Sequence, residues 1–291
     1  MSDIATARSG KTARDENFPV ASFLIDPDLR PVIHAFYRFV RAADDVADSP
    51  VLTSEEKLAR LDHLEAALRG RARDPDAAPL RRAFDWEGRS PRHALDLLEA
   101  FRLDVVKRRY ADLPDLIDYC RLSAMPVGRF VLDVHGEARS LWPASDALCA
   151  ALQIINHLQD CGEDYRKLDR VYLPLNILRA HGASVEMLSQ DCARDALKGA
   201  IAEIADHAAA LVEQGGRLIP QIANARLAAE IAAIHALAQR LAAQLRVRDP
   251  LKERIRLSNS ESLRIGGYAA ARALMRRLLP GSAWSWRRAS S

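Results

Sequence analysis

Cysteine is scarce in this chain of 291 residues, and its four cysteines never show the C-x-x-C spacing of a zinc or redox site. Aromatic residues make up only 6% of the sequence, and the alternating apolar and polar runs of β-strands are missing. There is no glycine-rich phosphate loop and no G-x-S-x-G elbow, so nothing indicates a P-loop protein or a serine hydrolase. No apolar run is long enough to span a membrane. A cytoplasmic protein with reduced thiols is therefore expected.

The charge balance excludes another class of protein. The net charge is only +3, although charged residues make up 28% of the sequence. No stripe of lysine and arginine is interleaved with aromatic residues, so nucleic acid is not an expected partner.

Apolar residues recur with a period of about 3.6 over most of the sequence, between short breaks that contain proline, glycine or aspartate. This pattern predicts an all-α domain over residues 17–280, after a disordered segment 1–16 and before a flexible basic tail 281–291. The charged residues 166–170 are expected to form a loop. The expected helices cover residues 31–47, 54–68, 79–86, 91–110, 114–135 with a kink at Pro126, 142–164, 191–218, 223–247 and 261–279.

Two acidic clusters, residues 44–48 and 160–164, stand in or beside apolar helical stretches. Asp44 and Asp48 are four residues apart, as are Asp160 and Asp164, so each pair would lie on one helix face. Such pairs repel by a few tenths of a kcal/mol unless a cation lies between them. A single cluster is more often a solvated face, but two of them favour metal binding. Oxygen ligands without nearby histidine or cysteine are typical of Mg²⁺ that also binds substrate phosphate.

Three motifs carry a resemblance to a known family. They are Tyr37-x-x-x-Arg41-x-x-Asp44-Asp45-x-x-Asp48, Gln153-x-x-Asn156-x-x-x-Asp160-x-x-x-Asp164 and Arg170-Val171-Tyr172-Leu173-Pro174. With them the chain resembles the squalene/phytoene synthases, the head-to-head prenyl synthases, from residue 17 to about residue 279. Residues 16–22 and 123–129 are similar to the bacterial hopanoid-pathway branch of that family, the hydroxysqualene synthases.

The resemblance implies an isoprenoid-synthase-type helical bundle around a central apolar cavity. It also implies Mg²⁺ as the cofactor and the conversion of presqualene diphosphate and water to hydroxysqualene and diphosphate. The expected partners are this substrate, or farnesyl diphosphate, and other enzymes of the squalene pathway.

Site residues follow from the resemblance, position by position. The implied metal ligands are Asp44, Asp48, Asp160, Asp164 and Asn156, and the implied catalytic residues are these five and Tyr119. The implied substrate-binding residues are Tyr37, Arg41, Gln153, Asn156, Arg170, Tyr172, Leu122, Met125 and Val127. An ion pair with Asp44 is the alternative for Arg41, and a core position is the alternative for Tyr37 and Tyr119.

Departures from the family pattern bear on the reaction. Ser123-Ala124-Met125 stands where Val-Ala-Gly is common in the family, and Leu122 stands where reductive squalene synthases have tyrosine. These differences favour the branch that captures water. One alternative is a synthase that joins two farnesyl diphosphates to presqualene diphosphate or squalene. The other is a non-catalytic partner that tethers such an enzyme to membrane, and the intact carboxylates argue against it.

The C-terminal sequence predicts a contact with membrane. Residues 268–288 combine apolar residues with five arginines, and Trp284 and Trp286 follow the apolar part. A basic amphipathic helix with interfacial tryptophans is typical of peripheral binding to an anionic bilayer, here the inner face of the plasma membrane. A terminal helix packed on the protein is the alternative.

Overall fold

The computed structural model describes residues 26–278. Its helices are α1 (Arg30–Ala47), α2 (Ser54–Leu68), α3 (Ala77–Glu87), α4 (Arg92–Val106), α5 (Leu113–Ser123), α6 (Met125–Val134), α7 (Trp142–Leu168), α8 (Leu175–Ala180), α9 (Asp195–Gly216), α10 (Ala225–Leu245) and α11 (Asn259–Leu278), with short 3-10 turns at Arg139–Leu141 and Val185–Ser189. This part of the chain has no β-strand beyond one isolated bridge, so the all-α class is confirmed. All four cysteines are free thiols, as expected.

Three predictions concern residues outside the described range. They are the disordered segment 1–16, the basic tail 281–291 and the contribution of residues 16–22 to the family resemblance. The limits of the single domain at residues 17 and 280 also lie outside it and stay predictions.

Helix α1 carries the first acidic cluster and is held by its apolar face. Pro31 occupies its first turn, where a missing N–H breaks no helical hydrogen bond. Phe36 stacks on Phe130 of α6, with ring centroids 3.8 Å apart. The helix α1 packs mainly against α3 and α4. The buried residues of α1 are Val32, Ile33, Ala35, Phe36, Phe39, Ala43 and Ala47. This packing fixes where the C-terminal end of α1 lies.

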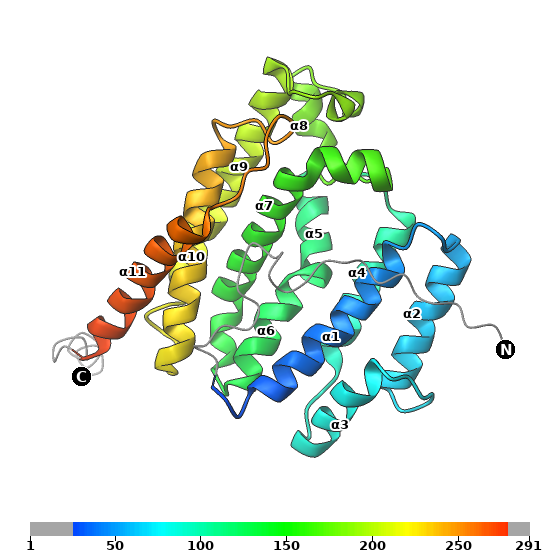
Figure 1. Cartoon of the computed structure of the whole chain (residues 1–291), viewed down its shortest axis with the longest axis vertical. Helices are drawn as coiled ribbons and strands as arrows, with labels where there is room; N and C mark the ends of the chain where they lie inside the picture. Colours follow the sequence, from blue (N-terminus) through cyan, green and yellow to red (C-terminus); the bar gives the residue numbers. More distant parts are fainter. Residues whose placement is uncertain (1–25, 279–291) are drawn as a thin grey trace, which may run out of the picture.

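Helix α7 carries the second acidic cluster and runs between α5 and α9 in Figure 1. It packs against α6, α9 and α10. Two of these contacts depend on glycine. A Cβ on Gly215 of α9 would lie 2.7 Å from the Cβ of Leu148, and one on Gly128 of α6 would collide with Ser145 and Cys149. Only glycine lets these helices approach α7 so closely.

The segment predicted as one kinked helix over residues 114–135 is two helices, α5 and α6. The break falls at Ala124, with φ −128° and ψ −46°. Because proline has no N–H and its ring clashes with the preceding turn, Pro126 cannot continue α5. It stands instead in the first turn of α6.

Two further boundaries differ from the prediction. The charged residues 166–170 are not all loop, because α7 continues to Leu168. Lys167 pairs with Glu163 one turn earlier at 2.6 Å, and basic residues favour a helix C-terminus. The helix expected over residues 91–110 ends at Val106, because the next residues run extended beside the chain that follows α7. There the backbone N–H of Val171 donates to the carbonyl of Arg108 at 2.9 Å.

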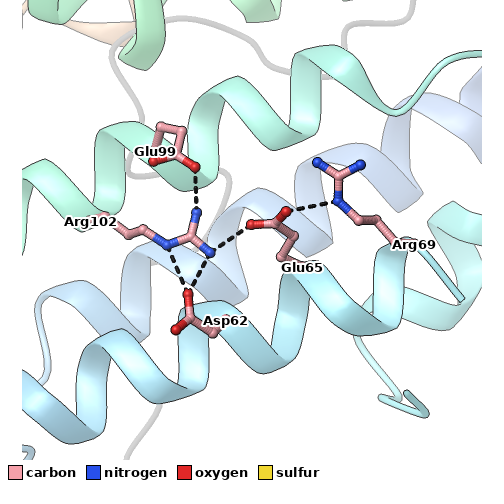
Figure 2. A network of polar contacts seen from close by, with 5 residues as sticks. All are labelled: Asp62, Glu65, Arg69, Glu99 and Arg102. Atoms are coloured by element: carbon pink, nitrogen blue, oxygen red, sulfur yellow. Dashed lines mark hydrogen bonds and ion pairs between the residues drawn. The ribbon is translucent and has the colours of Figure 1, made fainter. Parts of the chain in front are cut away.

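A polar network joins α2 to α4 on the surface (Figure 2). Arg102 of α4 lies 2.8 Å from Asp62, 2.7 Å from Glu65 and 2.8 Å from Glu99, and Arg69 binds Glu65 at 2.8 Å. Asp62 and Glu99 are exposed, so their pairs contribute up to about 1 kcal/mol each, whereas the pair of Arg102 with Glu65 is half-buried and connects the two helices.

Helix α11 packs along α10, at one side of the molecule in Figure 1. Gly266 is its only buried residue. None of the helices within residues 26–278 combines the length and hydropathy that crossing a bilayer requires.

Candidate active site

The first predicted acidic cluster lies at the C-terminal end of α1. The side chains of Asp44 and Asp48 are 35% and 36% exposed. Arg41 forms ion pairs with Asp44 at 3.2 Å and with Asp45 at 3.4 Å. The alternative suggested for Arg41, an ion pair with Asp44, is therefore confirmed, and the pair places a guanidinium group beside the acids.

The surroundings of the Asp44 carboxyl disfavour its ionised form. Burial, the largest cause, and the charge of Asp48 raise its pKa from 3.8 to about 7, although its side chain keeps some contact with solvent. Arg41 lowers this pKa, while Asp104 and Asp45 raise it further. A site that resists ionisation in this way gains from a bound cation.

The second predicted cluster lies in the last turns of α7. Asp160 and Asp164 are half-buried there, and Asn156 is half-buried one turn earlier on the same face. The negative charges of Asp164 and Asp160 contribute, after burial, to a pKa of about 12 for the Cys161 thiol. Both acids are therefore close enough to act on the thiol between them in the sequence.

Arg170 links the two clusters. Its Nη1 donates to Oδ1 of Asp48 at 2.6 Å, and its Nη2 donates to the carbonyl of Ala47 at 3.2 Å. Its Nε donates to the carbonyl of Asp104 at 3.0 Å. Its own backbone N–H donates to the carbonyl of Asp164 at 3.2 Å. One buried arginine thus reaches from the end of α7 to the end of α1.

The turn before Arg170 is also held in place. Asp169 ends α7 with φ 51°, in the left-handed region. Nη2 of Arg109 donates to Oδ1 of Asp169 at 2.6 Å, and the two segments run parallel where Arg109 bridges Val171. This pairing directs the Arg170 side chain inward.

Asp104 of α4 is a site residue that the sequence did not reveal. It is 5% exposed, and its Oδ2 accepts a hydrogen bond from the Tyr119 hydroxyl at 2.9 Å. Its Oδ1 accepts one from the Tyr172 hydroxyl, also at 2.9 Å. The sequence does place Asp104 on the apolar side of a predicted helix. A single acid, however, has no partner at helical spacing that would indicate a binding site.

Three tyrosines and a histidine form an aromatic group around this carboxyl. Tyr110 lies 5.3 Å from Tyr119 and 5.5 Å from Tyr172 between ring centroids. His157 stacks on Tyr172 at 3.6 Å, and its Nε2 lies 3.1 Å from Nε2 of Gln153. Burial, with the charge of Arg170 second, lowers the pKa of His157 to about 3, so its imidazole is neutral. Burial raises the pKa of Tyr119 and of Tyr172 well above 10, so both hydroxyls stay protonated.

The predicted metal-binding residues fit a cation that is also bound by phosphate oxygens of a substrate. In the part of the chain that the structure describes, no three His, Cys, Asp or Glu side chains gather closely enough to hold a metal alone. Each cluster instead offers one pair of carboxylates, and Mg²⁺ commonly takes one or two carboxylates together with phosphate oxygens. The raised pKa of Asp44 agrees with such a site.

The remaining predicted substrate-binding residues differ in burial. Tyr37 is half-buried on α1, one turn before Arg41. Leu122 is half-buried, and Met125 is 7% exposed in a small apolar cluster with Cys120 and Ala150. Val127, at 37% exposure, does not join the buried residues of the site. Their roles toward substrate stay predictions.

Comparison with known proteins places the chain in a family. Residues 11–261 match the squalene/phytoene synthase family. The chain is 52% identical to hydroxysqualene synthase of Rhodopseudomonas palustris over 278 residues, 95% of each protein. It is 50% identical to hydroxysqualene synthase of Sinorhizobium fredii, over 93% of each. The crystal structure of squalene synthase HpnC from Alicyclobacillus acidocaldarius superposes with a TM-score of 0.70 and 34% identity, covering 79% of this chain and 88% of that one. The chain is a member of the squalene/phytoene synthase family of enzymes.

Proposed function

We propose that this enzyme converts presqualene diphosphate and water to hydroxysqualene and diphosphate. Support comes from 50–52% identity to two proteins named hydroxysqualene synthase, over at least 93% of each chain. The structural observation that carries the proposal is Arg170, which connects the carboxylate pair on α1 with the end of α7 that bears the second pair.

The reaction balances without a redox cofactor. The bond between carbon and the diphosphate oxygen breaks, and the leaving group keeps the electron pair. The resulting carbocation rearranges and one bond of the cyclopropane ring breaks. A bond then forms between the rearranged cation and the oxygen of water, which loses a proton. NADPH is therefore not needed, in contrast to the alternative in which squalene is formed.

The residues proposed to hold Mg²⁺ are Asp44, Asp48, Asp160, Asp164 and Asn156. When bound, the metal supplies positive charge that stabilises the departing diphosphate.

Arg41 and Arg170 bind and orient the diphosphate. A guanidinium group presents several N–H donors in one plane, which suits phosphate oxygens. Arg41 already lies beside Asp44, and Arg170 already lies beside Asp48. Both cations therefore stand next to acids that are proposed to hold the metal, and the metal would bind the same anion.

The aromatic group protects the carbocation. Tyr119 and Tyr172 are 4% and 6% exposed, so bulk water has little access to their ring faces. Aromatic faces attract positive charge. Both hydroxyls donate to Asp104, which fixes the orientation of the two rings. Tyr119 is the tyrosine that we propose contacts the reacting carbons.

Product analysis tests this function. The purified enzyme is incubated with Mg²⁺ and presqualene diphosphate, without NADPH, and the extracted lipid is identified by mass spectrometry. A parallel sample receives farnesyl diphosphate, and a third contains EDTA. We expect hydroxysqualene from presqualene diphosphate in the first sample and none with EDTA. Presqualene diphosphate formed from farnesyl diphosphate would support the preceding step instead, and no turnover of either substrate would favour a non-catalytic partner.

We also propose that α11 docks on an anionic bilayer. Its residues Arg264, Tyr268, Ala271, Met275 and Leu278 recur with the spacing of one helix face, and all five are exposed. Tyr268 is 67%, Met275 55% and Leu278 81% exposed. An exposed face that combines apolar and cationic residues matches the interface of a membrane with anionic lipids. A C30 product would leave the enzyme directly into such a bilayer. Association with other squalene-pathway enzymes stays a prediction.

Vesicle flotation tests the membrane contact. We expect the enzyme to float with phosphatidylglycerol vesicles more than with phosphatidylcholine vesicles, and less as salt is added. The double variant Tyr268→Glu/Met275→Glu should stay in the soluble fraction. Val247→Glu, which charges an 84% exposed position outside α11, is the matched control and should float like the wild type. Equal flotation of the double variant would disprove this contact.

A further inference from the structure

All three oxygens of the buried residue Asp104 accept a hydrogen bond from a residue of the candidate site. Its two side-chain oxygens accept the hydroxyls of Tyr119 and Tyr172, each at 2.9 Å, and its carbonyl accepts Nε of Arg170 at 3.0 Å. Burying a carboxylate is costly unless hydrogen bonds and a cation compensate. The compensation found here comes from residues of the candidate active site.

The partners of Asp104 belong to separate parts of the chain. Asp104 lies in α4 and Tyr119 in α5, while Arg170 and Tyr172 follow α7. Arg170 continues to Asp48 of α1 at 2.6 Å. The carboxyl of Asp104 therefore ties α4 and α5 to the segment after α7, while its backbone carbonyl holds Arg170, which reaches α1.

Electrostatics agree with this arrangement. Burial raises the pKa of Asp104 to about 6, while Arg170 and the hydroxyls of Tyr172 and Tyr119 lower it and Asp48 raises it. The carboxyl therefore carries its charge at neutral pH because of these neighbours. In turn, its negative charge favours the buried guanidinium of Arg170.

We propose that Asp104 is the positioning residue that holds Arg170, Tyr119 and Tyr172 in the arrangement that binds diphosphate. The inference rests on the proposed function, in which Arg170 binds the leaving group. Asp104 does not touch the substrate in this account. It acts through the guanidinium and the two hydroxyls.

The test is Asp104→Asn, which keeps the size of the side chain but removes its charge and one of its two acceptor oxygens. Binding of inorganic diphosphate in the presence of Mg²⁺ is measured by titration calorimetry. We expect the affinity to fall about tenfold or more, because a hydrogen bond to a charged group is typically worth that much. The kcat for presqualene diphosphate should fall as well.

Glu137→Gln is the matched control for a merely structural role. Glu137 is also a buried carboxylate with two hydrogen bonds, accepting the backbone N–H groups of Ala223 and Asn224 at 2.9 and 2.7 Å. Its contacts lie outside the candidate site. We expect Glu137→Gln to lower the melting temperature and to leave diphosphate affinity within twofold of the wild type.

A second variant keeps the proposal testable if Asp104→Asn does not fold. Tyr172→Phe removes one hydroxyl and should weaken diphosphate binding about threefold, an ordinary hydrogen-bond effect. In the double variant Asp104→Asn/Tyr172→Phe the two losses should not multiply, because Asp104 acts partly through Tyr172.

Diphosphate affinity of a folded Asp104→Asn within twofold of the wild type would overturn the proposal, as would fully multiplied losses. Calorimetry does not depend on product identity, so failure of hydroxysqualene formation alone would count against the proposed function and not against Asp104.

Discussion

Asp44 and Asp48 stand one turn apart on α1 but have different neighbours. Asp44 pairs with Arg41 of its own helix, whereas Asp48 pairs with Arg170, 122 residues later in the chain. Each acid thus contacts one arginine and is also a proposed ligand of the metal that would bind diphosphate. Replacing one of these acids with a neutral residue should therefore change the net charge at the proposed metal and diphosphate site.

Asp44→Asn and Asp160→Asn should each lower turnover of presqualene diphosphate by about 100-fold or more, as expected when a group that stabilises the transition state is lost. The helical circular dichroism spectrum should not change. Asp118→Asn makes the same substitution at a 67% exposed aspartate of α5 and should keep full activity. Activity within threefold of the wild type in both site variants would refute the assignment of these acids.

His157 predicts a pH dependence of stability. Its pKa is about 3 in the folded protein and about 6.5 when unfolded, so the unfolded state binds more protons between these values. The stabilisation present above pH 6.5 is therefore lost as the pH falls. Between pH 7 and pH 4, the free energy of unfolding of the wild type should fall by roughly 3 kcal/mol more than that of His157→Gln. Denaturant titrations at both pH values measure this difference, and parallel losses would contradict it.

At the scale of elements, the two helices that carry the acids are positioned by their buried faces. The contact of α9 with α7 illustrates how tightly this is done, because Gly215 leaves no room for a side chain beside Leu148. In the interior of a helix, alanine normally replaces glycine with a gain of about 0.5–1 kcal/mol. At Gly215 the collision should reverse that sign.

We expect Gly215→Ala to lower the free energy of unfolding by about 1–3 kcal/mol, the usual cost of overpacking. Gly267→Ala is the matched control, because nothing lies within 4 Å of the added Cβ in α11. That variant should gain about 0.5–1 kcal/mol. Thermal or denaturant unfolding measures both effects, and a stabilised Gly215→Ala would show that α9 does not press on α7 as described.

The sequence predicted elements better than it predicted their ends. Helical periodicity identified the helices that carry both acidic clusters, because apolar spacing of 3.6 marks a buried face. It did not predict the break at Ala124, where the clash of Pro126 with the preceding turn prevails over a continuous apolar pattern. It also did not predict that α7 runs to Leu168, since a charged stretch resembles a loop unless its pairs, such as Glu163 with Lys167, are recognised.

At the scale of the whole molecule, the site joins segments that are distant in sequence. The pairs Asp44/Asp48 and Asp160/Asp164 could be predicted because each is a local pattern on one helix. The contact of Arg170 with Asp48 could not be predicted, because it depends on where the fold places the segment after α7 relative to the end of α1. Asp104 escaped for a related reason, since its partners Tyr119 and Tyr172 come from other elements. Local patterns thus indicated the chemistry, and the fold determined which residues support it.

A crystal structure of the enzyme with Mg²⁺ and inorganic diphosphate tests the central claim most directly. The account predicts metal ions bound between the diphosphate oxygens and the carboxylates of Asp44, Asp48, Asp160 and Asp164, with Arg170 beside the same anion. It would be contradicted by diphosphate and metal bound elsewhere while these four carboxylates face solvent on opposite sides of the protein.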